Sequence, residues 1–468
     1  MLSFVSIVVL MVIPQRHLFF LSGAPRLFFA APLVVFIAGL LVAYAIKERE
    51  LFRQVTKLFR TNIPLIAFLS FNILFVVVSY IVINGLTVAD VSIGLQRWWI
   101  NFFLTQLSVL CAWYIGTRIS VLGNKKLGIA LVVALGGMLT LALGEYFHLG
   151  GFHNPIGAWI GRVNDISLTL HSVYIWNEAE PVRAQGLAHY PSLYAFTALI
   201  AFCWALASKK LVLLRSAVVV MSVFLCFLTG TRTAFFAFAL VLMAFIILLA
   251  KRGELVSWFK INYKTFLIVN ALIVVLIGGV GVFVQSNNVV RNIPSSSESI
   301  PEESVTSYVE QPKSDYEVQL DQLTSYEKRV FLFVDEFTSG RGDLWFQALE
   351  RIASEPLGSW QPSGFLLDGN GHAHNEVLNR WITGGPVAVA LYLWFLVWLL
   401  WKPRSKMAPF FPKLLAIALL SFGLFEVVFD QAVFAPIALF VLGYVTTIPP
   451  PTENGREREI SAHIREVS

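Results

Sequence analysis

Long apolar runs separated by short polar segments make up most of the chain. A helix that crosses a bilayer needs about 20 consecutive, mostly apolar residues, and about twelve windows meet that requirement. The pattern predicts an all-α fold, a polytopic membrane bundle of about twelve transmembrane helices that forms one membrane-integral domain over residues 1–468. The windows have their centres near Val9, Phe36, Leu74, Leu107, Leu135, Leu199, Val220, Leu240, Val274, Trp394, Ala418 and Ala438.

Basic residues gather in every second connection between these windows. Cytoplasmic loops of membrane proteins carry such an excess of lysine and arginine, so we expect both termini, including the tail 449–468, in the cytoplasm. The alternate connections then face outward, and they include two long loops, 147–190 and 286–383. The basic clusters occupy residues 47–60, 118–126, 209–215, 251–264, 402–413 and 456–465.

Composition agrees with a bilayer environment. Hydrophobic residues make up 57% of the chain and charged residues only 14%, which is more apolar surface than a soluble core needs. The net charge of +6 comes from the short loop clusters, so it does not indicate a nucleic-acid partner. The three cysteines lie inside apolar runs without metal or disulfide spacing, and we expect neither kind of site from them.

The outward loop between the ninth and tenth windows has two parts. Residues 295–321 hold seven carboxylates against one lysine and are predicted to be a flexible or peripherally packed insertion. A helical pattern follows, and an amphipathic helix is expected to begin just after Thr338 or Ser339 and to stop before Pro356. Such a helix would lie on the outward rim of the bundle and cover a cavity. Its apolar positions are Leu344, Trp345, Ala348, Leu349 and Ile352.

Two arginines stand out at the outward face. Arg232 follows a tight turn, and Arg341 falls in the first turn of the amphipathic helix, where the helix dipole disfavours a cation. A bound phosphate would remove that conflict, because backbone N–H groups and a guanidinium would share its oxygens. The alternatives are an interface anchor for Arg232 and a surface ion pair of Arg341 with Asp343 or Glu336.

Two histidines occupy the segment 371–378. Alternation puts His372 and His374 on one side of an extended segment, which could hold a metal, yet no third ligand with metal spacing accompanies them. An imidazole gains and loses a proton near neutral pH, so His374 can instead take a proton from an attacking hydroxyl. An ordinary loop histidine is the remaining possibility.

Further polar residues complete the candidate site. Arg183 precedes the sixth window and could add a phosphate or sugar contact, and Glu426 and Asp430 could orient a histidine. With aromatic walls from Trp345, Trp360 and Trp381, the set fits an anionic, amphipathic substrate that carries a sugar.

The order of these segments resembles the O-antigen ligase and polymerase superfamily of bacterial inner-membrane glycosyltransferases. The resemblance rests on residues 230–232, a long outward loop, Gly340-Arg341 with Trp345 nearby, and above all the stretch 372–378 before a glycine-rich span start. It extends from about Arg183 to Gly385. The Pro191-Ser192 pair departs from the usual Pro-Asn, and the acidic insertion 295–321 has no counterpart.

The resemblance implies an O-antigen ligase, which moves O-antigen glycan from undecaprenyl diphosphate to a sugar hydroxyl of the lipid A core in lipopolysaccharide biosynthesis. Arg232 and Arg341 would hold the diphosphate and His374 would be the base, with His372, Asn375 and Arg183 in support. We also place Trp345 and Arg380 at the substrate. Two guanidiniums would stabilise the leaving diphosphate without a metal or other cofactor, and one direct displacement would invert the anomeric centre.

The sequence also allows other functions. An O-antigen polymerase or a protein O-oligosaccharyltransferase of the same superfamily would use the same donor. A flippase or transporter also fits twelve spans with cytoplasmic ends, although transporters usually place ionisable residues near the bilayer midplane, where these windows hold few charges. We expect an inner-membrane enzyme with a periplasmic active site, whose partners are the lipid-linked donor, the lipid acceptor and membrane lipids, without nucleic acid.

Overall fold

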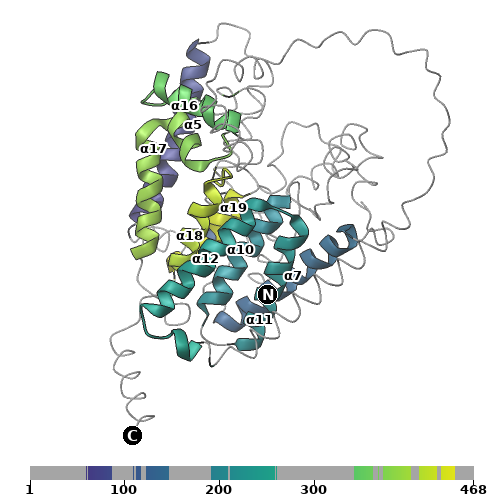
Figure 1. The fold of residues 1–468 in the computed structure, drawn as a ribbon. Helices are drawn as coiled ribbons and strands as arrows, with labels where there is room; N and C mark the ends of the chain where they lie inside the picture. Colours follow the sequence, from purple (N-terminus) through teal and green to yellow (C-terminus); the bar gives the residue numbers. More distant parts are fainter. Residues whose placement is uncertain are drawn as a thin grey trace, which may run out of the picture.

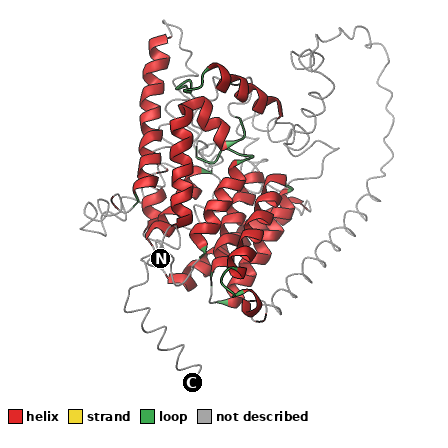
Figure 2. Cartoon of the chain, turned by 60° about the vertical axis from the view of Figure 1, so that its left-hand side comes forward, coloured by secondary structure: helices red, strands yellow, loops and turns green. Residues whose placement is uncertain are grey.

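Every regular element in the described residues is an α-helix (Figures 1 and 2). The computed structural model describes residues 60, 62–86, 109, 112–117, 123–146, 191–208, 211–258, 260, 342–361, 367, 373–401, 410–429 and 434–447. The helices are α5 (Ile63–Leu86), α7 (Gly123–Tyr146), α10 (Pro191–Ala207), α11 (Val212–Thr229), α12 (Arg232–Ala250), α16 (Gly342–Ser354), α17 (Glu376–Trp401), α18 (Phe411–Gly423) and α19 (Ala435–Thr447).

Eight of the predicted windows coincide with helices, namely α5, α7, α10, α11, α12, α17, α18 and α19. Four stretches within these helices are long and apolar enough to cross a membrane, and α5, α10 and α18 contain shorter apolar stretches. The windows near Val9, Phe36 and Val274 lie outside the described residues, as do both termini and most of the two long loops, and the window near Leu107 is described only at residues 109 and 112–117. The all-α class is therefore confirmed for the described residues, while the twelve spans, the division of the domain and the sidedness stay predictions.

Helix α10 lies at the centre of the bundle. Every residue from Leu193 to Ala207 is buried, which is the pattern of a helix surrounded by other helices. Its neighbours are α7, α11, α12 and α18. The hydroxyl of Thr197 donates to the carbonyl of Leu193 at 2.9 Å, so this buried polar group is satisfied within its own helix.

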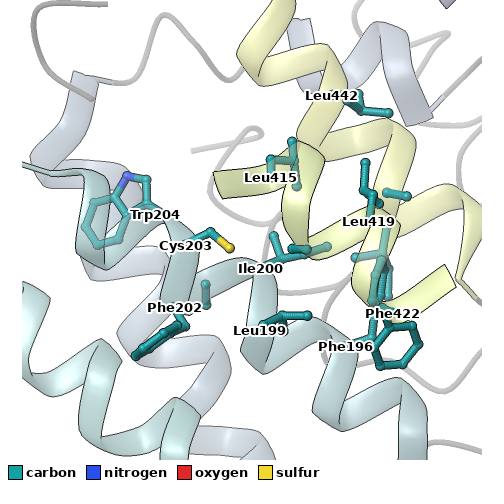
Figure 3. Close-up of a cluster of buried hydrophobic side chains, with 14 of the residues drawn as sticks. Phe196, Leu199, Ile200, Phe202, Cys203, Trp204, Leu415, Leu419, Phe422 and Leu442 are labelled. Atoms are coloured by element: carbon teal, nitrogen blue, oxygen red, sulfur yellow. The ribbon is translucent and has the colours of Figure 1, made fainter. Parts of the chain in front are cut away.

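Helix α18 runs antiparallel to both α10 and α12. Phe196 near the start of α10 packs on Phe422 near the end of α18, with ring centroids 4.9 Å apart (Figure 3). Near the other ends, Cys203 Sγ lies 3.7 Å from the carbonyl oxygen of Leu414. On α12, Phe245 likewise contacts Phe410, next to the start of α18. The starts of α10 and α12 and the end of α18 therefore meet at one end of the bundle.

Basic side chains mark the opposite end. Arg215, in the first turn of α11, donates from Nε to the carbonyl oxygen of Ala205 at 3.0 Å. The guanidinium of Arg252, after α12, lies 4.3 Å from the ring centroid of Phe410. Because three predicted cytoplasmic connections meet here, the arrangement agrees with the alternation expected from sequence. The third is the start of α7, where Gly128 lies against Trp204 and Leu214 and is preceded by the exposed Lys125 and Lys126.

Helix α17 is broken at Gly385, whose φ of 68° and ψ of −164° lie outside the helical region, and Pro386 follows. A proline ring cannot continue the helical hydrogen bonding, so the break is expected at this position. Helix α5 packs along α17 through Phe68 and Phe395, whose rings stack at 5.6 Å. The break divides α17 into a short segment, which carries the candidate site, and a longer apolar one.

Candidate active site

The candidate site begins at the N-terminus of α17, which Asn375 caps. Its Oδ1 accepts hydrogen bonds from the backbone N–H groups of Val377 (3.0 Å) and Leu378 (3.1 Å). An asparagine in this position satisfies donors that the first helical turn leaves open. Its Nδ2 donates to the carbonyl oxygen of Leu424 at 3.1 Å, which ties the start of α17 to the end of α18.

His374 precedes this cap and has a positive φ of 47°. A non-glycine residue adopts this left-handed conformation at a cost of about 1–3 kcal/mol, and such residues concentrate at functional sites. Its Nδ1 lies 3.3 Å from Oε2 of Glu426, 52 positions away in sequence. The His374 side chain keeps 24% of its surface exposed, whereas Glu426 keeps 7%. The pair thus joins a buried carboxylate to a partly accessible imidazole.

An aromatic contact brings the start of α12 to the same place. Phe236 meets Phe425 edge to face, with ring centroids 5.3 Å apart, and Phe425 immediately precedes Glu426. Arg232 lies one helical turn before Phe236 on the same face of α12 and is exposed. The structure therefore places the predicted arginine one turn from Phe236, whose ring contacts Phe425, the residue before Glu426.

Helix α16 also contacts residues of this site. Trp345 lies against the same Phe425 ring, with centroids 6.2 Å apart. Leu344 and Ala348 are buried in a small apolar cluster with Ala373 and Ile382. The predicted amphipathic helix and its end before Pro356 are confirmed, and among its apolar positions Leu349 is 50% exposed. Leu349 therefore lies beyond the edge of the face that its neighbours bury.

The segment after α16 crosses the break in α17. Gly358 and Gly385 touch so closely that a Cβ on Gly385 would lie 2.1 Å from the Leu357 carbonyl oxygen. The backbone N–H of Trp360 donates to the carbonyl oxygen of Thr383 at 2.8 Å. The Trp360 ring packs 5.7 Å from that of Phe71 on α5. Trp381, another aromatic residue predicted to line the site, donates from Nε1 to the carbonyl oxygen of Pro356 at 3.1 Å. This hydrogen bond also stabilises the crossing.

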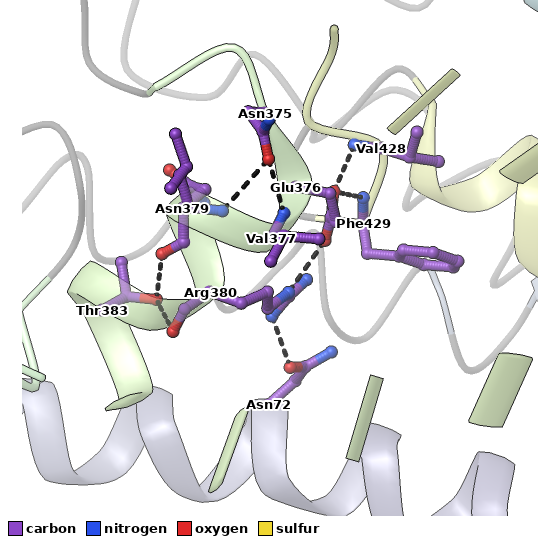
Figure 4. Close-up of polar contacts among 10 residues, drawn as sticks. Asn72, Asn375, Glu376, Val377, Asn379, Arg380, Thr383, Val428 and Phe429 are labelled. Atoms are coloured by element: carbon purple, nitrogen blue, oxygen red, sulfur yellow. Dashed lines mark hydrogen bonds and ion pairs between the residues drawn. The ribbon is translucent and has the colours of Figure 1, made fainter. Parts of the chain in front are cut away.

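A buried ion pair supports the first turns of α17 (Figure 4). Arg380 Nε donates to Glu376 Oε1 at 2.8 Å, and Arg380 Nη1 donates to Asn72 Oδ1 on α5 at 2.7 Å. Arg380 is only 4% exposed. This burial favours a structural role, and the contact between Arg380 and substrate stays a prediction.

Several predicted residues lie outside the described part of the chain. These are Arg183, Arg341 and His372, together with Asp430. Their roles stay predictions. Among the described residues, no group of three or more histidine, cysteine, aspartate or glutamate side chains is arranged to hold a metal ion.

Residues 217–393 match the family model described as O-antigen ligase. This part of the chain is similar to the O-antigen ligase family. Proteins of this family are glycosyltransferase-like enzymes. No curated protein matches the chain significantly.

The match to the O-antigen ligase family covers α12, α16 and the first part of α17, and so includes Arg232, Trp345 and His374. It ends before α18, so Glu426 lies outside the matched segment. The carboxylate that contacts His374 therefore comes from a part of the chain that the family match does not reach.

Sequence reasoning missed three contributors to the site. Phe236 and Phe425 looked like ordinary apolar residues, and no local pattern pairs residues from two distant helices. Glu376 was passed over, although its four-residue spacing to Arg380 is the spacing of a helical ion pair. That spacing was the one signal in the sequence that could have identified the buried pair.

Proposed function

We propose that this chain is an O-antigen ligase that moves O-antigen glycan from undecaprenyl diphosphate to a sugar hydroxyl of the lipid A core. The observation that carries the proposal is the contact between His374 and Glu426 within a chain that matches the O-antigen ligase family. A glycosyl transfer to a hydroxyl needs a base at the acceptor, and a histidine held by a carboxylate is suited to that task.

In the proposed reaction the two imidazole nitrogens of His374 have different partners, Glu426 at Nδ1 and the acceptor hydroxyl at Nε2. When Nδ1–H donates to the Glu426 carboxylate, Nε2 is the unprotonated nitrogen. Nε2 would take the proton of the acceptor hydroxyl as its oxygen attacks the anomeric carbon of the donor sugar. The bond from that carbon to the diphosphate oxygen breaks, the diphosphate leaves with the electron pair, and the anomeric centre is inverted. Glu426 would stabilise the imidazolium that results.

Arginines would hold the diphosphate. Arg232 is exposed at the start of α12, one turn before the Phe236–Phe425 contact, and this position supports its proposed role. A guanidinium presents paired N–H donors to phosphate oxygens and keeps its charge at any physiological pH. Together with the predicted contributions of Arg341 and Arg183, it would stabilise the negative charge that develops on the leaving oxygen, so that no metal is needed.

The proposed reaction takes place at the surface of a membrane. A lipid-linked donor and a lipid acceptor that share a bilayer surface meet at high local concentration, which favours transfer between them. The basic end of the bundle, with Arg215 and Arg252, would face the cytoplasm, and the end with His374 would face the periplasm. We therefore propose a multi-pass inner-membrane protein with a periplasmic active site.

Deletion of the gene in its host tests the proposal. Loss of a ligase leaves bare lipid A core while polymer accumulates on the lipid carrier. Core that carries a single repeat would instead identify a polymerase, and unchanged lipopolysaccharide with loss of glycosylated protein would identify a protein O-oligosaccharyltransferase. Retention of donor on the cytoplasmic leaflet would indicate a flippase.

A further inference from the structure

The segment that follows α18 is buried without being helical. Val427, Val428 and Phe429 are at most 2% exposed and lie between the end of α18 and the start of α19. Buried backbone N–H groups need acceptors, and an irregular segment cannot supply them from its own helix.

Glu376 supplies those acceptors from α17. Its Oε2 accepts from the backbone N–H of Val428 at 2.6 Å and of Phe429 at 3.3 Å (Figure 4). Its other oxygen, Oε1, accepts from Arg380 Nε at 2.8 Å. Glu376 is 0% exposed, and an ion in such a place is tolerated only when it is paired and hydrogen-bonded. The Arg380 charge, itself anchored on Asn72, meets that condition.

The two ends of this contact lie close in sequence to the two members of the His374–Glu426 pair. Glu376 comes two residues after His374, and Val428 comes two residues after Glu426. Asn375 makes a second connection between the same segments through the carbonyl oxygen of Leu424. The imidazole and its carboxylate are thus enclosed by two cross-links, one on each side of Glu426 in sequence.

We propose that Glu376 is a positioning residue that holds the Glu426 carboxylate against His374 by fixing the backbone of residues 427–429. This inference rests on the proposed function, because it assigns Glu376 a role in the same transfer reaction. The carboxylate acts through Glu426 and does not touch the substrate. A second, fully buried carboxylate therefore belongs to the site.

The substitution Glu376→Gln keeps the shape of the side chain but replaces one acceptor oxygen with an NH₂ group. That group then faces either Arg380 or the backbone donors of Val428 and Phe429, and one of the two contacts is lost. If residues 427–429 shift, Glu426 moves with them. We expect kcat to fall about tenfold while KM changes little, since the loss affects the base and not substrate binding.

A double-mutant cycle between Glu376 and Glu426 separates positioning from general stabilisation. The full-length protein is purified with each single substitution to Gln and with both, and transfer is measured with lipid extract from the deletion host, which supplies donor and acceptor. Glu426→Gln is expected to lower kcat about 100-fold, and the double variant should be no slower than Glu426→Gln alone within a factor of about three. A double variant about 1,000-fold slower than wild type, the product of the two losses, would overturn the proposal.

Glu355→Gln is the matched control. Glu355 also pairs with an arginine one helical turn away, Arg351, at 2.9 Å, but this pair is only partly buried and lies at the end of α16. Its substitution should leave kcat unchanged. Should Glu376→Gln fail to yield folded protein, the cycle uses Glu376→Asp, which keeps the charge beside Arg380 but is one methylene shorter, under the same criterion.

These experiments distinguish failure of the positioning role of Glu376 from failure of the proposed ligase function. If wild-type protein transfers no glycan in these extracts, or if His374→Ala remains active, the ligase mechanism fails whatever the cycle shows. If wild type is active and His374→Ala is not, independent losses at Glu376 and Glu426 remove only the positioning role of Glu376.

Discussion

Phe236 lies edge to face against Phe425, with ring centroids 5.3 Å apart, and this contact joins the helix of Arg232 to the turn of Glu426. Arg232 precedes Phe236 by one helical turn, and Glu426 follows Phe425 directly. A cation that can bind diphosphate and a carboxylate that can orient a histidine are therefore connected through one pair of rings.

Arg232→Ala should lower transfer about 10²–10³-fold, because a preorganised donor to the leaving diphosphate is lost. Arg232→Lys should restore part of the activity, since the ammonium keeps the charge but not the paired donors. The measurement is the rate of glycan transfer by purified variants at saturating acceptor. An Arg232→Ala variant as active as wild type would assign Arg232 to interface anchoring.

Glu426→Gln should lower kcat about 10²-fold with little effect on KM. The amide can turn its NH₂ group toward Nδ1 of His374, which places the imidazole proton on Nε2 and removes the lone pair that the acceptor hydroxyl needs. Glu254→Gln, at the opposite end of α12, is the control and should behave as wild type. Equal activity of the two variants would show that the carboxylate does not assist the histidine.

The crossing of Gly358 and Gly385 should not tolerate a side chain. In Gly385→Ala the new Cβ would meet the Leu357 carbonyl at 2.1 Å, and its φ of 68° adds strain, so we expect a loss of about 3 kcal/mol of stability. Gly137→Ala on α7 is the matched control, because a Cβ there meets nothing within 4 Å. Thermal unfolding in detergent compares them, and equal melting temperatures would contradict the close packing at the crossing.

Chelation should leave the enzyme active. Two or three guanidiniums are proposed to stabilise the leaving diphosphate, so EDTA added to a purified preparation should not reduce the rate of transfer. Inhibition that a divalent ion reverses would favour a metal held by His372 and His374.

The sequence predicted those features that depend on local periodicity. The helices around Leu74, Leu135 and Trp394 followed from runs of apolar residues, and the end of α16 followed from Pro356. Of the apolar positions in that helix, Leu344 and Ala348 are buried, whereas Leu349 is exposed. Periodicity indicates a face but not how much of it a neighbour covers.

Contacts between distant segments were predicted only where chemistry limited the choice. Glu426 was one of two acids considered as partners for a histidine, and the structure places it 3.3 Å from His374. Nothing in the sequence pairs Phe236 with Phe425, since aromatic residues are abundant in this chain and any of them could meet. Arg380 was expected at the substrate because it is a cation near the outward face, whereas its burial beside Glu376 depends on how α5 packs on α17.

Transfer by His374→Ala, measured against wild type in purified full-length protein with lipid extract from the deletion host, tests the proposed role of His374 most directly. Loss of the base should lower the rate by about 10²–10⁴-fold, while the variant still inserts in membranes and elutes as wild type does. A His374→Ala variant that transfers glycan at the wild-type rate would contradict the mechanism.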